Sequence, residues 1–84
     1  MAIREELIGA IDMALSGDWE ATHKLVQKHG NDRRANLFHA TLHRQQGDND
    51  NAMHWYRRAG IAGWPATAPE IQLAMLRDEL QSQA

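Results

Sequence analysis

Histidine is the residue type with most scope for chemistry in this 84-residue chain, which contains five histidines and no cysteine. His39 and His43 lie four residues apart in the string HATLH, so a helix would project both imidazoles from one side. Two such imidazoles can share a metal ion if the fold brings up a third ligand. The candidates for that ligand are His23, Asp48 and His54. A metal-binding or small-ligand-binding protein centred on His39 and His43 is therefore one function that the sequence allows.

Simpler explanations compete with a metal site, and catalytic signatures are weak. HATLH lacks the general base of the zinc-protease motif HExxH, because Ala40 stands where the glutamate would be. The pair can equally hydrogen-bond across a helical hairpin.

The sequence shows no catalytic group of residues. Ser16 and Ser82 fall in an expected turn and tail, with no histidine beside them. The acidic residues lie mostly at expected helix starts, where capping and the helix dipole explain them. We expect no enzyme, no cofactor and no resident metal.

The hydrophobic pattern predicts the elements that position these side chains. Apolar residues recur with helical spacing over residues 3–15, 19–29, 33–46, 50–59 and 68–80, separated by Gly-Asp turns and a Pro-containing loop. This predicts an all-α fold in a single domain over residues 1–84, made of two antiparallel helical hairpins and a C-terminal packing helix. His23 is expected on the solvent side of the second helix, and His39 and His43 on a flank of the third.

The stretch from Arg44 to Gly60 organises the expected fold. After the Gly47-Asp48 turn, small and aromatic residues share one helix face, with polar residues opposite. If the helices on either side of Gly47 are antiparallel, His39 lies level with Trp55. The expected core positions in this hairpin are Phe38, Leu42, Ala52, Trp55, Tyr56 and Ala59.

Residues 17–30 and 47–60 both begin with Gly-Asp and end with Gly, which predicts a degenerate helix–turn–helix repeat with an offset of 30 residues. The Gly-Asp turn and the following helix resemble tetratricopeptide repeats, and NAMHWYRRAGIAG at 51–63 resembles the Sel1-like subclass. The resembling positions are Ala52, Trp55, Tyr56, Arg58, Ala59 and Gly63. The first unit departs from this pattern at Thr22, Val26 and His29. The resemblance implies a helical-repeat fold that binds proteins.

Residues 17–27 and 39–48 also resemble strings, GDWxxxHxLVQ and HAxLHRxxGD, found in a family of small bacterial proteins. No activity comes with this second resemblance. It implies a bacterial origin and nothing about the site.

Charge is distributed unevenly although the net charge is only −2. Residues 1–23 hold five carboxylates and one arginine, whereas residues 24–58 hold seven lysines and arginines and three aspartates. The basic middle could attract an anionic partner, complement the acidic helices or form a solvated face. Nucleic acid is not expected, because helical phase points Trp55 and Tyr56 inward and Arg57 and Arg58 outward. A charged N-terminus and the lack of a long apolar run predict a cytoplasmic protein without a membrane partner.

The fifth helix is apolar on two sides. Leu73, Leu76 and Leu80 form one stripe, and Ile71 with Met75 forms another nearly opposite it. The second stripe is either covered by the loop around Trp64 or left for a partner.

The leading interpretation is a non-catalytic module that binds a protein or peptide, with a homodimer as one form that it can take. The residues predicted to bind the partner are His39, His43, His54, Arg57, Arg58, Trp64, Ile71 and Met75.

Overall fold

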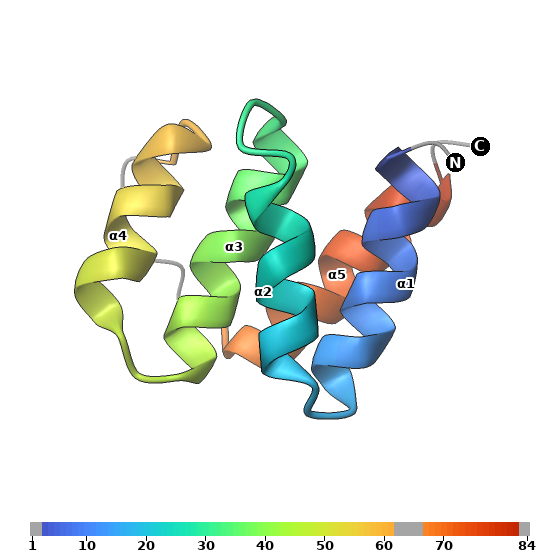
Figure 1. Cartoon of the computed structure of the whole chain (residues 1–84), viewed down its shortest axis with the longest axis horizontal. Helices are drawn as coiled ribbons and strands as arrows, with labels where there is room; N and C mark the ends of the chain where they lie inside the picture. Colours follow the sequence, from blue (N-terminus) through green and yellow to red (C-terminus); the bar gives the residue numbers. More distant parts are fainter. Residues whose placement is uncertain (1–2, 62–66, 83–84) are drawn as a thin grey trace.

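The computed structural model describes residues 3–61 and 67–82 and shows five helices (Figure 1). They are α1 (Ile3–Leu15), α2 (Trp19–Gln27), α3 (Arg33–Gln45), α4 (Asn49–Arg58) and α5 (Pro69–Ser82). Every expected helix is present, with bounds within two residues of those predicted, and no strand occurs in the described ranges. The all-α fold class is confirmed.

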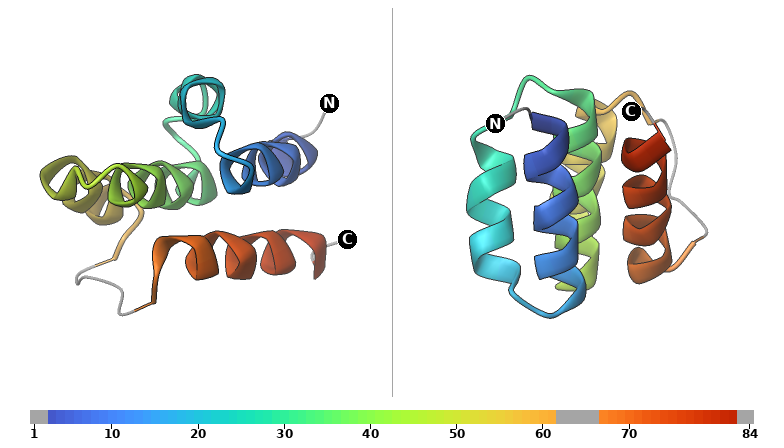
Figure 2. Two further views of the ribbon diagram at one scale, coloured as in Figure 1. Left: turned by 90° about the horizontal axis from the view of Figure 1, so that it is seen from below. Right: turned by 90° about the vertical axis from the view of Figure 1, so that its right-hand side faces the viewer.

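The helices form three layers around α3. Figure 2 shows α1, α3 and α4 in one row, with α2 on one side of that row and α5 on the other. α3 packs against each of the other four helices. A side chain on α3 is therefore surrounded by protein in most directions, which explains why polar residues on this helix are buried.

The two Gly-Asp turns have closely similar geometry. Gly17 and Gly47 have φ angles of 100° and 74°, a region that favours glycine. Asp18 and Asp48 follow with φ, ψ of −85°, 73° and −90°, 77°, and each caps the next helix by accepting a backbone N–H at 3.4 Å. Helix starts at residues 3 and 33, and at 19 and 49, keep the same spacing of 30 residues.

The core is built from the predicted helix faces. Leu7, Ile11, Phe38 and Leu42 are fully buried and join Leu73, Leu76 and Leu80 of α5 in one cluster. The predicted core positions Ala52, Tyr56 and Ala59 are also buried. Trp55 was also predicted to be mostly buried, and it is partly buried and packs against the cluster of Ala40, Ala52 and Tyr56. One face of its ring packs on an imidazole, as described below.

A polar contact ties α5 to the second hairpin. The hydroxyl of Tyr56 donates a hydrogen bond of 2.7 Å to Oε1 of Gln72, and Nη1 of Arg44 donates to the same oxygen at 3.0 Å. The contact joins α3, α4 and α5 at one point, and because Tyr56 is fully buried its hydroxyl needs such a partner.

The second apolar stripe of α5 is exposed. Ile71 and Met75 expose 56% and 59% of their surface, whereas Leu73, Leu76 and Leu80 are buried. Trp64, the residue proposed to cover this stripe, lies outside the described residues.

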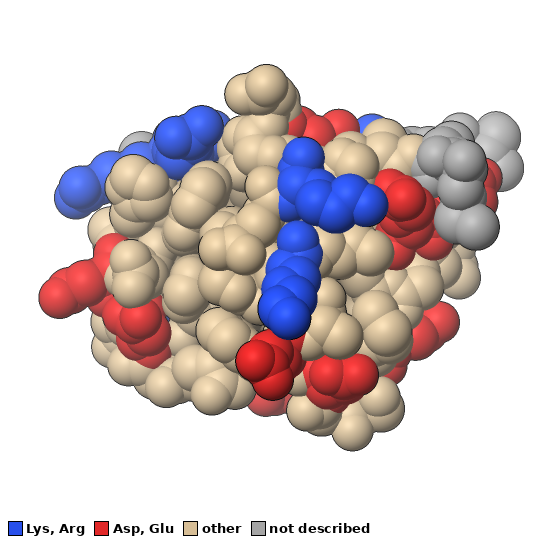
Figure 3. Space-filling model, viewed as in Figure 1, with Lys and Arg blue, Asp and Glu red and all other residues tan. Residues whose placement is uncertain are grey.

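Basic side chains do not form a single continuous patch on the face drawn in Figure 3, where lysines and arginines lie in separate groups. In the described part of the chain, none of the helices has the length and apolar character needed to cross a bilayer.

Candidate metal centre

α3 supplies two histidines to a buried cluster. His39 and His43 lie one turn apart with their rings stacked, and the ring centroids are 5.0 Å apart. His39 exposes 1% of its surface and His43 exposes 9%. The sequence placed them on a flank of the helix, but α3 is covered on that side by α2 and α4. The pair therefore lies inside the protein.

α2 brings a third histidine to the same place. Nε2 of His23 lies 2.9 Å from Nε2 of His39, so one of these nitrogens donates its hydrogen to the other. One ring nitrogen from each of His23, His39 and His43 can be chosen so that all three lie within 4.8 Å of one another. The prediction that His23 faces solvent was wrong, because α2 packs against α3 and its ring turns toward α3. Of the three candidates for the third ligand, His23 is the one that joins the pair.

Two tryptophans stack on rings of the cluster. Trp19 stacks on His23 with centroids 4.6 Å apart, and its indole Nε1 donates a hydrogen bond of 2.9 Å to the carbonyl of Leu42. Trp55 stacks on His39 at 4.0 Å, as the expected register of the α3–α4 hairpin implied. Stacking fixes the planes of both imidazoles, which favours a preorganised site.

Burial keeps the three imidazoles neutral. Loss of hydration, assisted by repulsion from His23, His43 and His54, lowers the pKa of His39 to about 3. Burial also lowers the pKa of His43, assisted by His23 and opposed by Asp48. Burial lowers the pKa of His23 as well. At neutral pH each ring therefore has a lone pair that a metal ion can use.

Asp48 faces the cluster from the start of α4. Its Oδ2 lies 3.7 Å from Nδ1 of His43, and the same carboxylate accepts a hydrogen bond of 2.6 Å from the side-chain amide of Asn51. The Asn51 hydrogen bond is the main cause that lowers the pKa of Asp48, so the group is an anion at neutral pH. A carboxylate facing Nδ1 of His43 leaves Nε2 as the nitrogen available for a ligand.

His39 has a further unusual property. Its Nδ1 is buried and has no hydrogen-bond partner in the described structure. An unpaired buried nitrogen costs roughly 1–3 kcal/mol. A buried polar group without a partner calls for an explanation. Packing alone therefore explains the burial of His39 less well than that of the other two histidines.

The remaining predicted binding residues do not gather around the cluster. His54 is exposed and packs edge-on against Trp55, while the Arg58 guanidinium lies 5.1 Å from the centre of the Trp55 ring. Arg57 is exposed on α4. The predicted partner-binding residues Ile71 and Met75 lie on α5, which packs mainly against α1 and α3 and meets α4 through the Tyr56–Gln72 hydrogen bond. The predicted set is therefore not one surface.

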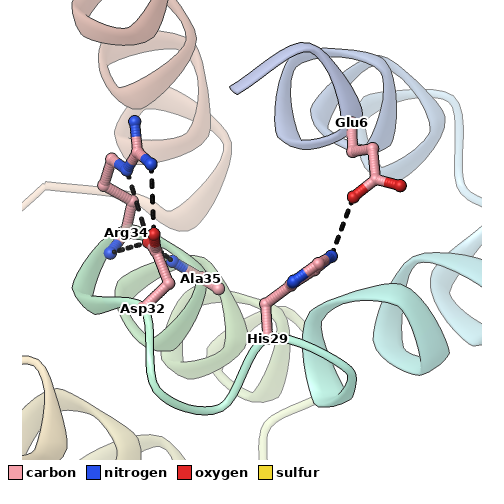
Figure 4. A network of polar contacts seen from close by, with 5 residues as sticks. All are labelled: Glu6, His29, Asp32, Arg34 and Ala35. Atoms are coloured by element: carbon pink, nitrogen blue, oxygen red, sulfur yellow. Dashed lines mark hydrogen bonds and ion pairs between the residues drawn. The ribbon is translucent and has the colours of Figure 1, made fainter. Parts of the chain in front are cut away.

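The fifth histidine lies apart from the cluster. Nε2 of His29 is 2.8 Å from Oε2 of Glu6, and Figure 4 shows this contact between the end of α2 and α1. The same view shows Asp32, the N-cap of α3, accepting hydrogen bonds from the backbone N–H groups of Arg34 and Ala35. His29 has a carboxylate partner of its own, which makes it a suitable control for the other three.

The stacking of the Trp19 ring on His23 was not predicted from the sequence. The available signal was their spacing, because residues four apart on a helix lie on the same face.

An open groove beside α3 and α4 would have indicated a different kind of site. Rings fill this region instead, and the described residues form no detected pocket.

Comparisons of the chain with protein-family models, with curated proteins and with solved structures find no match. The likeness to tetratricopeptide and Sel1-like repeats therefore stays a prediction.

Proposed function

We propose that this protein binds one divalent transition-metal ion, with zinc as the reference ion, through His23, His39 and His43. The observation that carries the proposal is the approach of three neutral imidazole nitrogens, from two helices, to within 4.8 Å of one another. This is the alternative function that the HATLH spacing indicated, now with a third ligand.

The distances suit a metal ion of this size. Zinc–nitrogen bonds of about 2.0 Å at tetrahedral angles place ligand nitrogens about 3.3 Å apart. The nitrogens of His23 and His39 are 2.9 Å apart, and no pair in the group exceeds 4.8 Å. Binding therefore requires the nitrogens of His23 and His39 to separate slightly and the more distant nitrogens to approach one another.

The donor set restricts the class of ion. Imidazole suits zinc, copper, nickel and iron, whereas calcium and magnesium require oxygen ligands. The cluster contains no carboxylate among its three members. A transition-metal ion is therefore the class that fits.

The competing explanation is a packing cluster without a metal. The hydrogen bond between His23 and His39 and the stacks on Trp19 and Trp55 would stabilise the rings on their own. The unpaired Nδ1 of His39 does not decide between the two explanations, because an ion bound at Nε2 would leave that atom without a partner as well. The packing explanation predicts that added metal has no effect, which separates it from our proposal.

Calorimetric titration with zinc distinguishes the two. We expect one saturable event per chain in the wild type and in His29→Asn, and no such event in His23→Asn. His23 is half-buried, so this variant should fold, which its circular dichroism spectrum verifies. Zinc at about 100 times its Kd should raise the free energy of unfolding of the wild type by about 2.7 kcal/mol. A flat titration of the folded wild type would refute the proposal.

The leading sequence-based interpretation, a module that binds a protein or peptide in the cytoplasm, also stays a prediction. The exposed Ile71 and Met75 are compatible with it, but nothing in the structure shows what would cover them. We assign no catalytic role.

A further inference from the structure

We infer that the ion held by His23, His39 and His43 keeps one coordination position open, and that this position takes a small monodentate anion from solvent. The inference rests on the proposed metal binding and adds to it the class of exogenous ligand.

The first argument is the number of protein ligands. Within the described ranges the group of close donor atoms has three members, one short of the four that zinc adopts in closed structural sites. Three protein ligands with a fourth position left to solvent or substrate are typical of open zinc sites. The donor count alone therefore points to an open position.

The second argument is that neither neighbour able to complete the set lies among the close donor atoms. The carboxylate of Asp48 faces the Nδ1 side of His43 and is held by Asn51 at 2.6 Å. The ring of His54 packs edge-on against Trp55, with centroids 5.1 Å apart. Using either residue as a ligand would break the contacts that it makes in this structure.

The third argument concerns access. His39 and His43 are buried, and Trp55 covers one face of His39. His23 is the half-buried member, so solvent reaches the cluster along its side. The three histidine rings are in contact with one another, with centroids 4.6–5.1 Å apart, so an exogenous ligand here must be small.

The fourth argument is charge. Three neutral imidazoles do not compensate the two positive charges of the ion in a largely buried site, and the Asp48 carboxylate at its edge supplies a single negative charge. An uncompensated charge away from water is unfavourable, so an anion is preferred over a neutral ligand of the same size.

The test uses cobalt as a spectroscopic probe and azide as the anion. The full-length protein is loaded with one equivalent of cobalt, and the visible absorption bands are followed during titration with azide. We expect a saturable spectral change with one azide per cobalt, identical in the control His29→Asn. His54→Ala should change the apparent Kd of azide by less than about threefold, because His54 is not a ligand.

The outcomes separate the inference from the proposed function. Cobalt binding with one-to-one stoichiometry and no azide response would overturn the open position and leave metal binding intact. An azide response that appears only in His54→Ala would show that His54 closes the site, which also overturns the inference. Failure of the folded wild type to bind cobalt or zinc would overturn both.

Discussion

The Nε2 atoms of His23 and His39 lie 2.9 Å apart, although the two residues are on different helices and 16 positions apart in the chain. This contact depends on α2 packing against α3 and on Trp19 and Trp55 fixing the two ring planes. With His43 one turn further along α3, it converts a histidine pair into a three-nitrogen cluster.

Asp48 provides a test of how the cluster is oriented. Asp48→Asn keeps a good helix cap but removes the charge that faces Nδ1 of His43. We expect zinc affinity to fall about 10- to 100-fold, the range typical when a partner of a metal-bound histidine is lost. Calorimetric titration measures this change.

The matched control is Asp18→Asn, which alters the equivalent cap of the first Gly-Asp turn. Both variants should lose similar amounts of stability, and only Asp48→Asn should lose zinc affinity. Equal zinc affinities in the two variants would show that Asp48 acts as a cap and does not orient His43.

The metal-free protein should lose stability as the pH falls below 7. The pKa of His39 is about 3 in the folded state, against an ordinary value of 6.5. Between these values the unfolded chain binds more protons, so the free energy of unfolding decreases as the pH falls, by up to about 1.4 kcal/mol per pH unit for this group. The lowered pKa values of His23 and His43 act in the same direction.

Chemical denaturation at pH 7 and pH 5 measures how the free energy of unfolding changes with pH. Both pH values lie above the range in which Asp48 titrates. His39→Phe keeps a ring against Trp55 but cannot titrate, so its stability should change less between the two pH values than that of the wild type. An unchanged slope would mean that His39 is hydrated and readily protonated in the folded protein.

The α3–α4 hairpin should be sensitive to added volume. Ala52 is fully buried against Ala40 and Tyr56, so Ala52→Leu should destabilise the protein by roughly 1–3 kcal/mol through overpacking. Thermal and chemical denaturation report the change. Asn49→Leu, at an exposed position of the same helix, is the control and should have little effect. Equal stabilities in the two variants would contradict the assignment of the buried face.

The exposed stripe of α5 should contribute little to the stability of the monomer. Ile71→Glu with Met75→Glu is expected to change the free energy of unfolding by less than about 1 kcal/mol, because both side chains already face solvent. Sedimentation of the wild type and this variant tests the predicted partner surface. A wild-type dimer that the variant disrupts would support that prediction, whereas two monomers would exclude self-association there.

Much of the fold was predictable because its signals are local. The Gly-Asp turns and the periodic apolar residues give the five helices, and the i, i+4 spacing of His39 and His43 places both rings on one side. The position of His23 depends on how α2 rotates against α3. Its neighbours Glu20, Lys24 and Gln27 are exposed, so helical phase alone assigned it to solvent. The hydrogen bond with His39 turns the ring toward α3, and that contact is tertiary.

Trp55 shows a second limit of helical phase. Its phase matches that of Tyr56 and correctly predicts packing on the hairpin core, but it does not predict that the ring also stacks on His39 and lies close to the Arg58 guanidinium. An aromatic residue at a core phase can therefore serve as the wall of a polar cluster. Sequence periodicity does not distinguish these two roles, because both bury one face of the ring.

Anomalous diffraction at the zinc edge from crystals grown with zinc tests the central claim most directly. The account predicts one strong peak per chain, about 2.0–2.1 Å from one ring nitrogen of each of His23, His39 and His43. A peak bound only by exposed residues, such as His54 or the Glu6–His29 pair, or no peak between α2 and α3, would contradict it.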